Sequence, residues 1–244
     1  MSFSELASAM ISLETLIVRG VSRLRTGPDG ALTLDVCGHL RKLGCGAVLM
    51  DLDADQFVES LTRSGEMYLS MLTLQDEEPV DEYYLWRSQG APLFDALAAG
   101  NVELAVAIST EMTDRCRSED GESEEDFRYS QVVGLLAAGD DATARLGAAM
   151  RAFENALQGG ESRRYDVVRA IIDRDQGEFD EVFAASVVEW QEELVAGGLD
   201  PYGEVTTAFI SVEGLALARL ARLRGLQIAN EYQFIPDVVL DAAP

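Results

Sequence analysis

Three aspartates in alternate positions, Asp51, Asp53 and Asp55, follow an apolar run over residues 47–50. If the run forms a strand, one aspartate can attack a substrate while a neighbouring aspartate serves as acid and base. If the run instead ends a helix, Asp53 or Asp55 caps a following helix over residues 56–74. The two interpretations predict different folds, so the surrounding elements decide between them.

The strand interpretation resembles the nucleophile motif of haloacid dehalogenase-like phosphatases, and such an enzyme is a remote alternative for this chain. That family alternates strands with helices and needs further Ser/Thr, Lys and Asp motifs. Here the single lysine, Lys42, lies upstream of the aspartates, and the downstream chain has helical periodicity. We therefore expect a helix end, no catalytic residue and no enzyme.

The residue types that ligate metals also fail to form a recognisable site. Cys37, Cys45 and Cys116 show no paired Cys-x-x-Cys spacing, and His39 is the single histidine. A structural zinc site needs four such ligands, and its ligands normally occur in closely spaced pairs. We expect free, buried thiols, no metal and no cofactor.

Charge is the strongest signal in the composition. The chain of 244 residues has 43 acidic and 19 basic residues, for a net charge of −24, and 48% of its residues are apolar. Such a chain is globular, and its surface repels nucleic acid and anionic membranes, so we expect a cationic partner. No run reaches the ~18 apolar residues of a membrane span. The N-terminus lacks a signal-peptide pattern, so we expect a cytoplasmic protein. The sequence leaves the oligomeric state open.

Helical periodicity extends along most of the chain and predicts an all-α fold. Helix, break and helix recur around Gly100, Gly139 and Asp175, at separations of 39 and about 36 residues. The two glycines can adopt the left-handed conformation that ends a helix, and Asn101 and Asp140 can cap the next one. Such a period is typical of helical hairpins. The fold is therefore either a helical bundle or a stacked, solenoid-like α-hairpin array.

Pro79 is the candidate domain boundary, because proline cannot continue a helix interior. It predicts an N-terminal helical subdomain over residues 1–78 and a domain of repeated hairpins over residues 79–244, with a fourth unit at residues 215–225. One continuous domain over residues 1–244 is the alternative.

Two acidic segments are the best candidates for contact with a partner. The first packs six carboxylates into eight positions without a cation between them; its residues are Glu119, Asp120, Glu122, Glu124, Glu125 and Asp126. The second interleaves acids with aromatic side chains, which tight interfaces favour. Its residues are Asp81, Glu82, Tyr83, Tyr84 and Trp86. A solvated loop and an inward-packing helix would explain the same patterns, and this alternative stays open.

The C-terminal part of the chain resembles the immunity protein 49 family of bacterial polymorphic toxin systems. The resemblance rests on residues 165–180, on a helix of the Leu-Ala-x-x-Arg-Gly type within residues 210–225, and on a tyrosine and a proline within residues 232–240. It is best over residues 90–244. The family is all-helical and similar in length, and it has no catalytic residues to carry over.

The resemblance implies a protein that is made beside a toxin, often a nuclease, and neutralises it by tight binding. The acidic segments agree with this role, because clustered carboxylates can occupy the basic groove of a nuclease. From the residues alone, the main alternative is a helical-repeat adaptor or chaperone that binds peptides or a secretion partner.

Overall fold

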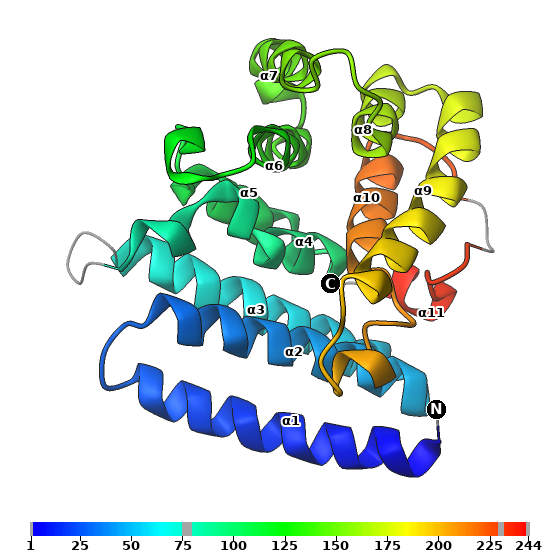
Figure 1. Ribbon diagram of the computed structural model, residues 1–244. Coiled ribbons are helices and arrows are strands. Elements are labelled where there is room, and N and C mark those ends of the chain that lie inside the picture. The colour runs from blue at the N-terminus through cyan, green and yellow to red at the C-terminus, as the bar shows by residue number, and fades with distance from the viewer. Residues whose placement is uncertain (1, 75–79, 229–231, 243–244) are drawn as a thin grey trace.

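The computed structural model describes residues 2–74, 80–228 and 232–242, without the side chains of residues 140 and 141. Within these ranges the chain is helical and contains no strand, which confirms the all-α prediction (Figure 1). The α-helices are α1 (Phe3–Leu24), α2 (Gly30–Asp51), α3 (Ala54–Leu74), α4 (Ala91–Ala98), α5 (Val102–Glu111), α6 (Glu124–Ala137), α7 (Thr143–Ala156), α8 (Arg163–Asp173), α9 (Gln176–Ala196), α10 (Val212–Leu223) and α11 (Asp237–Leu240). Short 3₁₀ turns are η1 (Glu82–Leu85), η2 (Arg87–Gln89), η3 (Ser118–Asp120), η4 (Gly139–Ala142) and η5 (Gly203–Val205).

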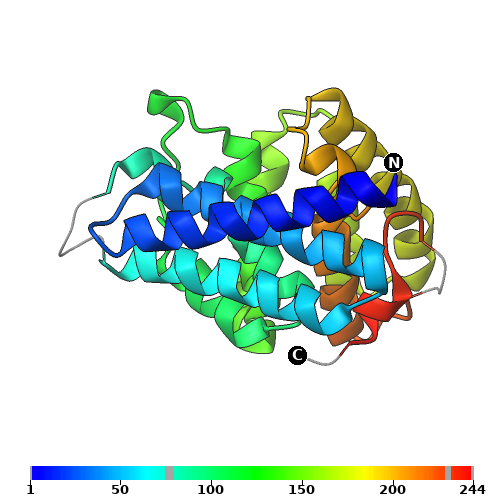
Figure 2. The same ribbon diagram turned by 90° about the horizontal axis from the view of Figure 1, so that it is seen from below.

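The N-terminal helices α1, α2 and α3 lie side by side, with α1 as the outermost helix (Figures 1 and 2). A capping box starts α1, because the Ser2 hydroxyl accepts from the Glu5 amide while the Glu5 carboxylate accepts from the Ser2 amide. One stripe of α1, including Leu6, Leu13 and Ile17, is buried, as its periodicity predicts.

Helix α2 runs through the segment for which a strand was one of the two interpretations. Residues 47–50 belong to α2, and Asp53 Oδ1 accepts a hydrogen bond of 2.9 Å from the Gln56 amide at the start of α3. The aspartates therefore mark a helix end and a cap, and the phosphatase interpretation is wrong because it requires a strand. Gly44 lets the two helices approach, since a Cβ there would lie 3.3 Å from the Phe57 backbone.

The helical hairpins occur where the local signals predict them. Gly100 has a φ of 82°, and Asn101 caps α5 by accepting from the Leu104 amide. Asp175 caps α9 in the same way. The break at Gly139, with a φ of 76°, is followed by η4 before α7 begins. The predicted cap at Asp140 lies outside the described side chains.

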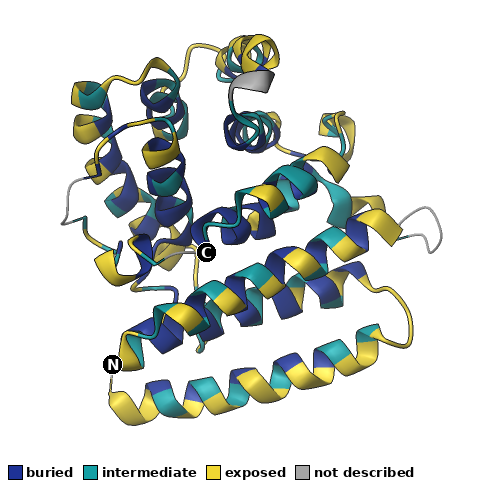
Figure 3. Ribbon diagram, turned by 180° about the vertical axis from the view of Figure 1, so that it is seen from behind, coloured by how far each residue is buried: buried dark blue, intermediate teal, exposed yellow. Residues whose placement is uncertain are grey.

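Helix α10 corrects the prediction of a fourth stacked hairpin. Most of its residues are buried, on every side of the helix, and it packs against α4, α8 and α11 (Figures 1 and 3). An apolar surface around the whole helix requires such a central place. Arg219 and Arg222 donate from α10 to the carbonyls of Val239 and Leu240, which ties the C-terminal segment to the core. The helix ends before Gly225, which has a φ of 91°.

The buried core extends across the segment around Pro79, which itself lies outside the described residues. Phe57 and Tyr68 from α3 belong to the same apolar cluster as Leu93 from α4 and Leu217 from α10. Helix α3 packs against both α4 and α5. Helices α2 and α3 therefore share one core with the hairpins, whereas Leu13 and Ile17 of α1 pack with Leu40 of α2 in a second apolar cluster.

A buried ion pair joins α2, α3 and α4 inside this core. Arg41 donates to both carboxylate oxygens of Asp95, at 2.5 and 2.9 Å, and the Ser64 hydroxyl donates to Asp95 at 2.6 Å. The Asp95 side chain is 0% exposed. A carboxylate at such a site is stable only while its partners remain.

We predict that Asp95→Ala destabilises the protein by about 3–5 kcal/mol, because it leaves the Arg41 charge without a partner. Urea unfolding measures this change. Adding Arg41→Met should recover part of the loss. Glu189→Ala, which breaks an exposed ion pair with Arg163, should cost less than about 1 kcal/mol. Equal effects of Asp95→Ala and Glu189→Ala would contradict the assigned role of the buried pair.

Candidate partner-binding surface

The two acidic segments singled out from the sequence lie together on one surface. Arg117, two residues before the first segment, forms an ion pair of 2.7 Å with Glu82 of the second. The Ser88 amide donates to Glu122 at 3.2 Å. We call the exposed side chains at this junction the acidic face. They are Asp81, Glu82, Tyr83, Asp114, Glu119, Asp120 and Glu124.

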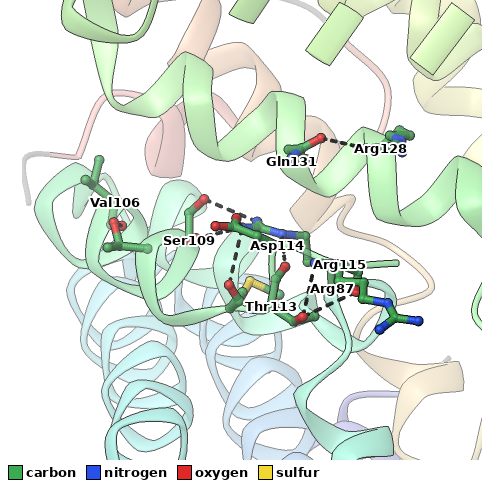
Figure 4. Close-up of polar contacts among 10 residues, drawn as sticks. Arg87, Val106, Ser109, Thr113, Asp114, Arg115, Arg128 and Gln131 are labelled. Carbon is green, nitrogen blue, oxygen red and sulfur yellow. Dashed lines mark hydrogen bonds and ion pairs between the residues drawn. The ribbon is translucent and has the colours of Figure 1, made fainter. Parts of the chain in front are cut away.

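The buried side chain of Arg87 holds the loop on which the acidic face is built (Figure 4). Its guanidinium donates to the Thr113 carbonyl at 2.6 Å and to the Ser109 carbonyl at 2.9 Å, and it pairs with Asp114 at 3.3 Å. The Ser109 carbonyl lies in the last turn of α5, where carbonyls lack helical partners. Burial lowers the pKa of Arg87, and the Asp114 carboxylate opposes this shift. Arg87 thus fixes the end of α5 and the loop that follows it.

Glu122 points into the protein, and this corrects its place in the predicted contact set. The residue is 4% exposed. Its carboxylate accepts from the Arg117 amide at 2.8 Å and from the amide and hydroxyl of Ser88 at 3.2 and 3.3 Å. Glu122 therefore joins the two acidic segments and cannot meet a partner in this conformation.

The last three carboxylates of the acidic run start helix α6. Ser123 caps this helix, and carboxylates in its first turn are favoured by the helix dipole. Glu124 is exposed, but Asp126 pairs with Arg164 of α8 at 3.0 Å, and Glu125 accepts from the Ser162 hydroxyl at 2.9 Å. Both side chains are half-buried, and their contacts hold the start of α6 against the N-terminus of α8.

The aromatic residues of the second segment divide between surface and support. Tyr83 is 45% exposed, and its ring packs edge-on against the rings of Tyr84 and Trp86, at 5.1 and 5.0 Å between centroids. Tyr84 and Trp86 are half-buried, and Tyr84 lies so close to Gly30 that a Cβ there would clash with its ring. Tyr83 is therefore the aromatic side chain best placed for contact, supported by the other two.

Arginines moderate the charge of the acidic face. Arg115 forms an ion pair with Glu119 at 2.6 Å, and Arg128 forms one with Glu124 at 3.2 Å. A hydrogen bond with its own backbone lowers the pKa of Glu119, and Arg115 lowers it further. The acidic run contains no cation, but the arginines on either side of it in the sequence pair with its carboxylates. Attention to these flanking arginines would have predicted the partial neutralisation.

A cleft of about 470 Å³ lies behind this surface, between α5, α6 and α7. It has an arginine-rich lining that contains Arg87, Arg128 and Arg145. Small residues such as Gly134 and Ala149 form part of its wall. Asp114 of the acidic face also lines the cleft, so three arginines and one aspartate give the cleft a net positive lining beside that face.

The structure gives no support for a metal centre or a membrane segment. No group of three or more potential ligands from His, Cys, Asp and Glu occurs among the residues that the structure describes. Cys37 and Cys45 are buried, as predicted, whereas Cys116 is half-buried beside the acidic face. None of the described helices combines the length and apolar character that a membrane crossing requires.

Most of the chain matches one known protein family. The family model described as Immunity protein 49 matches residues 42–239. The chain belongs to the immunity protein 49 family. This membership confirms the resemblance seen in the sequence, and the matched region includes the whole acidic face but begins after α1. No curated protein and no solved structure matches the chain.

We predict that Glu122→Ala in this immunity protein 49 member costs about 1–3 kcal/mol, because the half-buried Ser88 and Arg117 lose the acceptor of their amides. Urea unfolding gives the change in stability. Asp120→Ala, a neighbouring exposed carboxylate, should change stability by less than about 0.5 kcal/mol. If the two substitutions have the same small effect, Glu122 does not join the segments.

We predict that thiol reagents distinguish Cys116 from the other two cysteines. Burial raises the pKa of Cys37 and of Cys45 to about 12. The pKa of Cys116 is also raised, first by burial and then by Glu122 and Glu124. At a given pH a smaller fraction of this thiol is therefore present as the reactive thiolate. Ellman's reagent at pH 8 should label one thiol in the folded protein, slowly, and three in urea. Cys116→Ser should abolish the folded-state reaction, and rapid labelling of all three would contradict the burial.

Proposed function

We propose that the chain is an immunity protein that neutralises a toxin by binding it through the acidic face. Its target is a basic toxin domain of the nuclease type, and its action is binding rather than catalysis. The observation that carries this proposal is the convergence of the two acidic segments on one surface of a family member. Family membership supports the immunity role, and the charge of this surface supports the choice of a basic target.

The charge of the acidic face suits fast association with a basic partner. Complementary potentials steer encounters and raise association rates, and they exclude partners of like charge. The groove that a nuclease presents to phosphates is rich in Lys and Arg. Exposed carboxylates such as Glu119 and Asp120 can take the place of phosphates there.

The rigidity of the acidic face suits tight association. Ordering mobile loops on binding costs free energy, which a preformed surface avoids. Arg87 fixes one edge of the face through the α5 end, and Glu122 joins the two segments from inside. Tyr83 projects from this framework as a rigid aromatic anchor, the residue type that often dominates interface energy.

We assign the predicted contact residues two roles according to their exposure. Direct contact belongs to the exposed side chains, which are Asp81, Glu82, Tyr83, Glu119, Asp120 and Glu124. Support belongs to the half-buried or buried side chains, which are Tyr84, Trp86, Glu122, Glu125 and Asp126.

A peptide-binding adaptor is the second candidate, and the arginine-lined cleft is the observation that favours it. Stacked helices often hold extended peptides in such grooves. Arg128 and Arg145 would select an acidic peptide, whereas the acidic face would select a basic folded domain. The two candidates therefore predict binding to different surfaces and opposite partner charges.

We predict that neutralising the acidic face slows binding to the cognate toxin and abolishes protection of the cell that produces it. The toxin to test is the product of the gene next to the one that encodes this chain. The test variant combines Glu119→Gln, Asp120→Asn and Glu124→Gln. Its association rate at low salt should fall by roughly ten-fold or more, because steering is lost. Survival on co-expression, co-purification and association kinetics measure the effect, and circular dichroism checks the fold.

A matched control removes the same charge from another part of the surface. Asp180→Asn, Glu181→Gln and Glu192→Gln replace exposed residues of α9, a helix at the right of Figure 1, away from α5 and η1. This control should protect as well as the unchanged protein. Equal protection by both triple variants would place the interface elsewhere. Failure of the unchanged protein to protect or to bind, together with binding of an acidic peptide in the cleft, would favour the adaptor.

A further inference from the structure

The outer face of α1 carries a seam of uncharged residues with coiled-coil spacing. The seam residues are Ser4, Ser8, Ile11, Thr15, Val18 and Ser22, and all of them are exposed. Successive members are separated alternately by four and three residues, which is the a/d spacing of a helix that pairs with another helix. The outer side of α1 is visibly exposed along its length (Figure 3).

This seam differs from an ordinary solvent face. A surface helix normally has polar and charged residues opposite its buried stripe. Here the buried stripe faces α2, yet the opposite stripe has no charged residue in a chain whose charged fraction is 25%. Ile11 and Val18 are 68% and 69% exposed, the level of the most exposed large apolar side chains in the described part of the protein.

We propose that the α1 seam binds the α1 seam of a second copy of the chain, in antiparallel orientation. Glu5 and Arg19 each follow a seam residue by one position, so they lie on the same flank, two heptads apart. In an antiparallel pair, Glu5 of each copy lies opposite Arg19 of the other. On the other flank, Ala7 lies opposite Val21, and Glu14 of one copy lies opposite Glu14 of the other, so this central pair opposes the two favourable Glu5–Arg19 pairs.

Local charge also favours a second copy as the occupant. Two chains with a net charge of −24 each repel one another over most of their surfaces. Helix α1 is balanced, because Glu5 and Glu14 are matched in number by Arg19 and Arg23. Antiparallel packing also places opposite ends of the helix dipoles together.

The α1 seam lies apart from the surface assigned to toxin binding. Helix α1 precedes the region that matches the family, which begins at residue 42. The acidic face extends from the far side of α2 and α3 toward α6, whereas the seam faces away from α2 (Figures 1 and 2). Self-association through α1 would therefore leave both acidic faces free, and its test does not depend on the toxin.

The strength of this pairing is limited by its size. One helix of 22 residues per copy spans ~33 Å, and four of its six seam residues are Ser or Thr. Interfaces at the low end of the size range belong to weak complexes. We therefore expect a reversible dimer with a dissociation constant in the micromolar range.

Sedimentation velocity on the full chain over a concentration series tests the pairing. The unchanged protein should pass from monomer to dimer as concentration increases. Combining Ile11→Glu and Val18→Glu should give a monomer throughout, with an unchanged circular dichroism spectrum because both positions are exposed. Val195→Glu, at an exposed apolar position of α9, should still dimerise. A monomer at every concentration for the unchanged protein, or a dimer that survives the α1 substitutions, would overturn the proposal.

Charge reversal tests the orientation. Arg19→Glu places two carboxylates opposite each other and should weaken the dimer at least several-fold, and Glu5→Arg in the same chain should restore it. In a parallel pair Arg19 would instead lie near Glu14 of the other copy. Rescue of Arg19→Glu by Glu14→Arg, but not by Glu5→Arg, would therefore overturn the antiparallel arrangement.

Discussion

The Asp95 carboxylate is the constraint on which the arrangement of this protein depends. A charge with no exposure to water is tolerated only where its partners are held in place. Arg41 and Ser64 meet this requirement from two other helices, so α2, α3 and α4 have one compatible alignment. Helix α4 follows η2 almost directly, and fixing α4 therefore also fixes Arg87. Arg87 in turn holds the end of α5, so that a series of buried polar contacts leads from the core to the acidic face.

Carboxylates with the same chemistry serve opposite purposes along this series. Glu122 and Asp126 accept hydrogen bonds or ion pairs inside the protein and set the shape of the acidic run. Glu119 and Asp120 are exposed and carry the field that a basic partner would meet. The difference comes from the chain's path, because Gly121, with a φ of 103°, reverses direction between Asp120 and Glu122. The acidic run can be ordered despite its like charges because Glu122 accepts hydrogen bonds from backbone amides and Asp126 pairs with Arg164.

Local signals allowed the helices to be predicted, and nonlocal contacts explain what could not be. Gly100 with Asn101, and Asp175, act within a few residues, so their breaks and caps are readable from sequence. Glu122 differs because Ser88, which contributes to its burial, lies 34 residues away. The sequence of α10 did contain a usable signal, since the four consecutive apolar residues 215–218 point to all sides of the helix. That composition indicates a central helix rather than another outer hairpin.

The uneven distribution of charge assigns each surface a different kind of partner. At physiological ionic strength, exposed charges interact over about 8 Å, and a layer of packed helices is about 8–10 Å thick. Helix α2 lies between α1 and η1 of the acidic face, so one helix layer separates that face from the seam and reduces its field there. A second copy can therefore approach α1 without meeting the repulsion that a net charge of −24 suggests. In the proposed function, the exposed carboxylates of the acidic face are the surface suited to a cationic partner. Local charge balance, more than total charge, decides where this protein can associate with itself.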